Sequence, residues 1–195
     1  MNKILAVLCA SLLAFPVGAE VDYTIDPTHT WPMFEVSHLG FSTQRGRFDK
    51  TSGKITLDIA AKKGSVELVI DTASIDMGFA KWNDHMKGED FFNVESFPTM
   101  RFTANKLTFN GNQPVAAAGT LTLLGESRPV TLGISDFKCG THPMTRRPMC
   151  GANISTTIKR SDFGMKKFIP AVGDEVKIHS PVEAFRDTPL DTQNN

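Results

Sequence analysis

The chain has 195 residues, of which 41% are hydrophobic and 22% charged, and its 21 basic and 21 acidic side chains give a formal net charge of zero. This balance is typical of one globular domain and excludes a fibre, a low-complexity tail and a coiled coil. It also argues against a nucleic-acid partner, because the basic surface that neutralises phosphates is missing.

The first 19 residues have the pattern of a secretory signal peptide. Lys3 supplies the positive start, residues 4–15 form an apolar stretch interrupted only by Ser11, and small residues lead to Ala19. We expect cleavage after Ala19 and a periplasmic or secreted protein. The apolar stretch is too short to span a bilayer, so we expect a soluble mature chain without stable membrane insertion.

Two cysteines remain after removal of the signal peptide, Cys139 and Cys150. An even pair in a chain bound for an oxidising compartment predicts a disulfide across a long hairpin loop. A metal site is the alternative, but it would need more thiols or clustered histidines, and only His142 is near.

Stretches of alternating apolar and polar residues, typical of strands with one apolar face, fill the first part of the mature chain. They lie at residues 21–25, 33–38, 55–59 and 66–70. We expect a turn at Ser52 and Gly53, ahead of the third stretch.

Residues 79–88 predict a short helix. Phe79, Trp82 and Met86 recur at i, i+3 and i+7, which places them on one helix face, and Gly88 can end the helix.

The stretch 90–102 contains four of the 14 phenylalanines. Phe91, Phe92 and Phe97 come first, and from Pro98 onward the alternation puts Met100 and Phe102 on one face of a strand. Two interpretations are open. The phenylalanines could form a core plug that closes one end of a β-structure, or the rim of an apolar cavity.

Strand-like stretches continue at 107–109, 121–123, 130–134, 154–158 and 176–184, and residues 186–195 predict a polar, frayed C-terminal tail. Eight or nine strands joined mostly by short turns predict an all-β protein. We expect an extended eight-stranded antiparallel β-barrel with a short helix before the Phe-rich strand, because closure removes exposed strand edges. A β-sandwich is the alternative fold.

Catalytic motifs with strong sequence signals are absent, among them the nucleophile elbow, the paired-histidine zinc motif and the phosphate-binding loop. We therefore predict no enzyme activity, no cofactor and no metal. Asp84, His85, Glu89 and Asp90 form a cluster, but such residues are more typical of helix caps and solvated charges.

His38 shares the inward face with Phe34 and Val36, so its ring needs a polar partner in an apolar interior. One interpretation is a core histidine bonded to a neighbouring carbonyl or carboxylate. The other is a donor to the polar end of a ligand. The same two interpretations apply to His29.

Several ordered motifs resemble those of the YceI-like family of periplasmic lipid-binding proteins, over residues 21–185. The matching segments are 26–29, 34–42, 45–48, 85–88, 90–98, 119–125, 128–132, 160–165 and 173–176. Two features depart from the family pattern. Trp82 and Asn83 replace the Arg-Asp pair common before the helix histidine, and the loop between the cysteines resembles an addition.

The resemblance implies a lipocalin-like barrel over residues 20–185 that binds, transports or stores a long-chain isoprenoid, either a polyisoprenoid or a polyprenyl quinone. We predict that this ligand contacts Phe34, Val36, His38, Phe91, Phe92, Phe97, Met100, Phe102, Leu121, Leu123, Phe163 and Met165. Two alternatives are a structural or stress-response barrel filled by its own side chains, and an enzyme acting on an isoprenoid or quinone through His38. The chain could also form a homodimer.

Overall fold

The structure is a computed structural model that describes residues 20–187. The predicted signal peptide, residues 1–19, lies outside the described residues, as do residues 188–195. The strands are β1 (Val21–Ile25), β2 (Met33–His38), β3 (Ser42–Phe48), β4 (Thr51–Asp58), β5 (Lys63–Asp71), β6 (Ile75–Asp76), β7 (Thr99–Asn110), β8 (Gln113–Leu123), β9 (Glu126–Thr141), β10 (Pro148–Lys159) and β11 (Val172–Arg186). The helices are α1 (Ala80–Lys87) and two 3₁₀-helices, η1 (Thr72–Ser74) and η2 (Arg160–Phe163).

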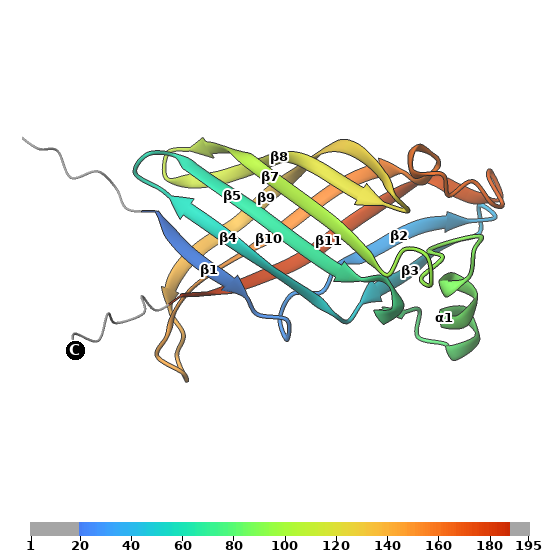
Figure 1. The fold of residues 1–195 in the computed structure, drawn as a ribbon, viewed down its shortest axis with the longest axis horizontal. Coiled ribbons are helices and arrows are strands. Elements are labelled where there is room, and N and C mark those ends of the chain that lie inside the picture. The colour runs from blue at the N-terminus through green and yellow to red at the C-terminus, as the bar shows by residue number, and fades with distance from the viewer. Residues whose placement is uncertain (1–19, 188–195) are drawn as a thin grey trace, which may run out of the picture.

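Eight of these strands close into an antiparallel barrel (Figure 1). The order around the barrel is β1, β4, β5, β7, β8, β9, β10 and β11, and β11 pairs back with β1, where Ala184 lies opposite Ile25. This closure leaves those eight strands without a free edge. The predicted eight-stranded barrel is confirmed, and the alternative of a sandwich is wrong.

Three shorter strands extend the wall at one end. β11 pairs with β1 near its C-terminus and with β2 in its first part, where Ile178 lies opposite Phe34. β2 therefore continues the wall position of β1, β3 adjoins β2, and β6 adjoins β3. Figure 1 places α1 beside β3 at this end, which we call the helix end. The β9–β10 loop lies at the opposite end.

The predicted turn at Ser52 and Gly53 is wrong, because both residues lie inside β4. A side chain at position 53 would collide with the main-chain carbonyl oxygen of Glu67 on β5. Glycine at this position therefore permits a close approach of two strands and does not serve a turn. The chain bends earlier, at Asp49.

The predicted helix is present as α1, and the main-chain N–H of Gly88 donates to the carbonyl of His85 at its end. Met86 is buried, whereas Phe79 and Trp82 are exposed, so only the last turn of the expected apolar face is buried. Residues 89–92 and 94–96 then form turns and no further helix.

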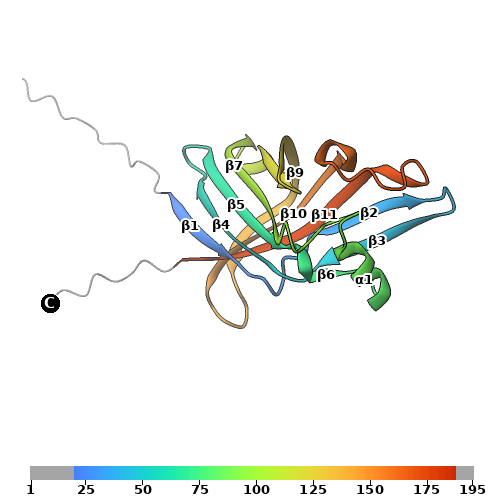
Figure 2. The ribbon, with the colours of Figure 1, turned by 45° about the vertical axis from the view of Figure 1, so that its right-hand side comes forward.

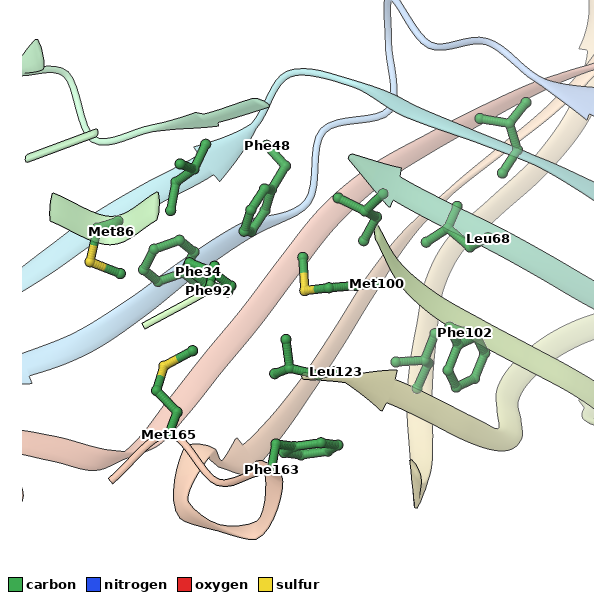
Figure 3. Packing of buried hydrophobic residues seen from close by; sticks show 14 of the residues in the cluster. Phe34, Phe48, Leu68, Met86, Phe92, Met100, Phe102, Leu123, Phe163 and Met165 are labelled. Atoms are coloured by element: carbon green, nitrogen blue, oxygen red, sulfur yellow. The ribbon is translucent and has the colours of Figure 1, made fainter. Parts of the chain in front are cut away.

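The buried hydrophobic residues form one cluster inside the barrel, part of which is shown in Figure 3. On β7 the side chains of Met100, Phe102 and Ala104 are all buried, which confirms the predicted inward face of that strand. In Figure 3, Met86 from α1 and Phe92 from the following loop lie beside Phe34 of β2. At the helix end, side chains of α1 and its following loop thus pack against the strands that extend the wall.

The sequence predicts a polar tail from residue 186 onward, but the barrel extends beyond this boundary. Arg186 is the last residue of β11, opposite Tyr23, and the Asp187 carboxylate accepts hydrogen bonds from Thr24 Oγ1 (2.6 Å) and Lys54 Nζ (3.1 Å). Polar residues are suited to this position because they lie on the solvated outer face of a strand pair. The boundary at residue 186 is therefore wrong.

Cys139 on β9 and Cys150 on β10 lie directly opposite each other and form a disulfide. The predicted cysteine pairing is confirmed. The bond joins the two limbs of the hairpin next to its loop, at the end of the barrel away from α1.

Candidate ligand-binding cavity

An apolar cavity of about 160 Å³ lies inside the barrel, toward the helix end. The strands point alternate side chains into it, and further lining comes from α1 and its following loop and from η2 and the residues after it. Ten of the twelve predicted ligand-contacting residues lie in its wall: Phe34, Val36, His38, Phe91, Phe92, Met100, Phe102, Leu121, Leu123 and Met165.

The other two predicted residues, Phe97 and Phe163, are not part of the lining. Phe97 packs on the β8–β9 turn, where a side-chain carbon at Gly125 would lie 3.0 Å from its ring. Phe163 belongs to η2 and is buried, with 2% of its surface exposed. Phe97 precedes β7 and Phe163 follows β10, so both side chains pack beyond the end of a strand. Periodicity along a strand does not distinguish this position from one that lines the cavity.

A second apolar cavity, of about 80 Å³, lies toward the opposite end of the barrel. Four residues line both cavities: Leu68, Phe102, Leu132 and Ile154. These side chains therefore form a partition between two compartments that lie in line along the barrel. Figure 3 shows two of them, Leu68 and Phe102, on neighbouring strands.

Three phenylalanine rings pack together at the helix end of the larger cavity. The centroid of Phe92 lies 5.2 Å from that of Phe48 and 6.3 Å from that of Phe34, and Phe34 and Phe48 are 6.0 Å apart. A side chain at Gly46 would collide with Met77 and with the Phe34 ring, so glycine makes room for this cluster. Phe92 lines the cavity and also packs in this cluster of rings. The Phe-rich stretch thus has features of both interpretations, the core plug and the rim of a cavity.

His38 lies in the cavity wall and is partly buried. Its ring centroid is 6.4 Å from that of Trp82, in an edge-to-face arrangement. Among residues 20–187 its ring makes no hydrogen bond, so the carbonyl or carboxylate partner of the first interpretation is not present. Its ring nitrogens are free to bond a polar group that enters the cavity.

Arg160 also borders the larger cavity, and it is buried, with 3% of its surface exposed. Its guanidinium donates to the carbonyl oxygens of Met165, Lys167, Val172 and Gly173, at 2.8 to 2.9 Å. Burial lowers its pKa from the usual value. The four bonds satisfy the fork of the side chain and hold the β10–β11 connection in place.

Asp174 binds the start of η2, next to Arg160. Its carboxylate accepts from the main-chain N–H and the hydroxyl of Ser161, at 2.9 and 2.8 Å. Partial burial acts to raise the pKa of Asp174, but these bonds and the charge of Arg160 outweigh it, so the pKa is lowered. Sequence reasoning missed both roles, because a single charged residue at the end or the start of a strand carries little signal.

Other lining residues were also missed, among them Phe48, Ile70, Met86, Ile158 and Val176. Ile70, Ile158 and Val176 belong to alternating stretches that predict strands. Periodicity identifies the apolar face of a strand, but it does not show which part of a long face borders a cavity.

Within residues 20–187, one group of three residues has potential metal-ligand atoms that all lie within 4.8 Å of one another: Asp26, His29 and Glu183. His29 Nδ1 is 2.8 Å from Asp26 Oδ2, and this hydrogen bond is the main cause that raises the pKa of His29. The Asp26 carboxylate also accepts from the main-chain N–H and the hydroxyl of Thr28, so hydrogen bonds account for the arrangement of Asp26 and His29, and we assign no metal there. In the cluster predicted near α1, which comprises Asp84, His85, Glu89 and Asp90, the Asp90 carboxylate pairs with Lys167.

A closed antiparallel barrel with an apolar interior and a short helix at one end defines the class of this protein. A family model described as the YceI-like domain matches residues 23–184. The chain therefore belongs to the YceI-like family. It is 33% identical to a UPF0312 protein of Shewanella denitrificans, over 95% of this chain and 98% of that protein. It is 32% identical to a UPF0312 protein of Pseudomonas aeruginosa, over 95% and 99%.

Solved structures share the fold. BcnA of Burkholderia cenocepacia matches with a TM-score of 0.69 and 25% identity, over 82% of this chain and 98% of that one. The YceI protein of Campylobacter jejuni matches with a TM-score of 0.65 and 23% identity, over 96% and 100%. A polyisoprenoid-binding domain from Saccharophagus degradans matches with a TM-score of 0.63 and 17% identity, over 86% and 99%.

In the part of the chain from Glu20 to Asp187, no helix combines the length and the apolar character needed to cross a bilayer.

Proposed function

We propose that this protein binds the hydrocarbon tail of a long-chain isoprenoid lipid inside its barrel, and that it carries or stores this lipid in the periplasm. The observation that carries the proposal is the larger cavity, whose wall is apolar from β2 to β11 and contains ten residues predicted from sequence. Apolar cavities of this kind favour hydrocarbon over water.

The size of the cavity limits what enters without rearrangement. A cavity of about 150 Å³ lined by aliphatic and aromatic residues holds benzene, so the larger cavity of about 160 Å³ accommodates about one isoprene unit, which has five carbons. A longer tail must displace the partition at Phe102 and continue into the second cavity. Each buried CH₂ contributes about 0.8 kcal/mol, so tail length dominates affinity and head-group specificity is loose.

The polyisoprenoid-binding domain from Saccharophagus degradans supports an isoprenoid as the ligand class, since it has the same fold. The periplasmic location is supported by the signal-like pattern of residues 1–19 and by the disulfide, which is typical of oxidising compartments.

We also propose that the protein binds its ligand without transforming it. The polar groups bordering the larger cavity are few, and the guanidinium of Arg160 is engaged with four carbonyls. His38 is the remaining candidate acid or base. If it bonds only a ligand head group, His38→Gln will weaken binding slightly and there will be no turnover of a polyprenyl quinone to lose. Turnover by the natural protein that disappears in His38→Gln would establish the enzyme alternative.

The first experiment is native mass spectrometry of the mature protein from a periplasmic fraction, followed by organic extraction. We expect a released lipid of isoprenoid mass. A mass that equals the apoprotein, and stays so after incubation with polyprenyl lipids, would support the alternative of a barrel filled by its own side chains.

Two matched variants on β11 locate the binding site. Val176 lines the larger cavity and Val182 the smaller one, and both are partly buried. We expect Val176→Phe to reduce the retained lipid of every chain length, because it fills part of the larger cavity. Val182→Phe should reduce only the retention of long tails.

A further inference from the structure

Three segments at the helix end expose large apolar side chains. We call these residues the helix-end rim: Leu39 and Phe41 in the β2–β3 turn, Phe79 and Trp82 at the start of α1, and Phe168 and Ile169 in the β10–β11 connection. Their exposed fractions range from 37% for Ile169 to 92% for Phe41. Exposed apolar residues concentrated at one site are typical of an interaction surface.

The three segments adjoin one another. The ring of His85 lies 6.3 Å from that of Trp82 and 6.5 Å from that of Phe168, so it bridges α1 and the β10–β11 connection. The main-chain N–H of Leu39 donates to the carbonyl of Ala171, at 2.6 Å, and joins the β2–β3 turn to the same connection. Figures 1 and 2 both place the three segments at one end of the barrel.

The helix-end rim meets the larger cavity. Trp82 is 44% exposed and also lines this cavity, and so does His38, the neighbour of Leu39 in the chain. Val172, which follows the β10–β11 connection, lines it too. Apolar surface therefore continues from the outside of the helix end into the interior.

The charge of the rim segments has one sign. Residues 38–44, 78–82 and 166–171 contain Lys81, Lys166 and Lys167 and no carboxylate. Lys167 Nζ lies 3.5 Å from the Asp90 carboxylate of the neighbouring loop, while Asp84 and Glu89 lie farther along α1 and that loop. Apolar side chains with a tryptophan and flanking lysines match the boundary between acyl chains and anionic head groups.

We propose that the helix-end rim docks on the surface of a bilayer that contains anionic phospholipids. The rim side chains enter the boundary of the acyl chains, the lysines contact phosphate groups, and the cavity opens toward the hydrocarbon. A long isoprenoid can then pass between membrane and barrel without crossing water. The transfer of lipid rests on the proposed function. Docking depends only on the surface of the protein, so it is measured on lipid-free protein.

Cosedimentation of lipid-free protein with vesicles of phosphatidylcholine and phosphatidylglycerol tests the proposal. Burial of one phenylalanine is worth roughly a factor of ten or more, so we expect Phe41→Ser and Phe168→Ser each to weaken vesicle binding by about that factor. The control is Met144→Ser, since Met144 is 86% exposed in the β9–β10 loop at the opposite end. This control should bind as the natural protein does.

A second readout gives the orientation. The chain has two tryptophans, and Trp31 precedes β2, at the other end of that strand from the β2–β3 turn, under the guanidinium of Arg47 (5.6 Å). In Trp31→Phe, Trp82 is the sole tryptophan, so brominated acyl chains should quench its emission and shift it to shorter wavelength when vesicles are added. Replacement of Lys81, Lys166 and Lys167 by Ser should weaken binding about fivefold per lysine at low salt.

Absence of vesicle binding, or equal losses in Phe41→Ser and Met144→Ser, would overturn the proposal. A concentration-dependent dimer that Phe41→Ser abolishes, without binding to vesicles, would also overturn it and would assign the rim to a second copy of the chain. Lipid extracted from a protein that never binds vesicles would leave the proposed function intact and remove the docking. Vesicle binding by a protein whose cavity takes no lipid would do the reverse.

Discussion

Phe102 on β7 and Leu68 on β5 stand directly opposite each other, and both side chains line the larger and the smaller cavity. Phe102 is the larger of the two and is buried, with 3% of its surface exposed. On β8, a side chain at Gly119 would lie 2.7 Å from the Phe102 ring, so the ring is held against that strand.

Phe102→Ala should join the two cavities. We expect a loss of about 3 to 5 kcal/mol in unfolding free energy and a shift of preference toward longer polyprenyl chains. Native mass spectrometry with an equimolar mixture of short and long polyprenyl lipids measures the preference. Phe102→Leu, which retains most of the volume, is the control, and an unchanged preference in Phe102→Ala would show that Phe102 does not limit tail length.

Arg160→Lys should destabilise the barrel. A lysine cannot reach four carbonyl oxygens in the geometry of a guanidinium, and each buried carbonyl left without a donor costs roughly 1 to 3 kcal/mol. We expect a loss of about 3 kcal/mol in urea unfolding. Arg128→Lys is the control, because Arg128 is exposed and pairs with Glu126, and it should change stability by less than about 0.5 kcal/mol. Equal effects of the two substitutions would contradict the role of Arg160.

Removal of the disulfide should weaken the fold and leave the larger cavity unchanged. The bond closes a loop between Cys139 and Cys150, which corresponds to roughly 3 kcal/mol of stability in the chain-entropy model. We expect the double variant with Ala at both positions to lose about this amount and to retain lipid as before. Free thiols detected by labelling the native mature protein would show that the bond does not form.

The hydrogen bond between His29 and Asp26 should give the stability a pH dependence. Partial burial acts to raise the pKa of Asp26, but hydrogen bonds from Thr28 and His29 outweigh it and lower the pKa, whereas the same bond with Asp26 raises the pKa of His29. The contribution of Asp26 is present above its unfolded pKa and disappears as the pH falls. That of His29 is complete below its unfolded pKa and disappears as the pH rises through its folded pKa.

His29→Gln should therefore lower the melting temperature most between about pH 4 and pH 6.5, the unperturbed values of the two groups. The difference from the natural protein should shrink at alkaline pH and at strongly acidic pH. His179→Gln is a control on the exposed face of β11, and it should show a smaller dependence. A constant difference across the range would mean that the protonation of His29 makes no contribution to stability.

Most of the fold was predictable from the sequence because alternation and length suffice to define strands. The inward faces of β2 and β7 follow directly from this period, and so do the positions of Phe34, Val36, Met100 and Phe102 in the cavity wall. Gly53 could not be assigned correctly, because a glycine required by a close approach and a glycine required by a turn look alike in a sequence.

The rest of the site depends on contacts between distant segments. The partition involves Leu68, Phe102, Leu132 and Ile154, which come from four strands, and no local pattern indicates that they meet. The environment of Arg160 likewise arises from the path of the β10–β11 connection. The closure of β11 on β1 brought Asp187 into contact with Thr24, whereas its polar neighbours in the sequence indicated a free tail.

The segment 79–96, which contains α1, is attached to the barrel in an unusual way. Within the described chain, every main-chain N–H of this segment that makes a hydrogen bond donates to another residue of the same segment. Its attachment consists mainly of the buried side chains of Met86, Phe91 and Phe92 and of the Asn83 side chain, which accepts from the N–H of Met77.

Local opening of this segment therefore breaks no ladder of the barrel, and we expect it to form a separate cooperative unit of lower stability than the strands. Amide hydrogen exchange should show residues 82–96 exchanging together, faster than the amides of β7 or β10 and without dependence on global unfolding. A bound tail that contacts Phe91 and Phe92 should slow this exchange while leaving the strands unaffected. Opening of this segment would thus expose the interior of the barrel while the hydrogen bonds between its strands stay intact.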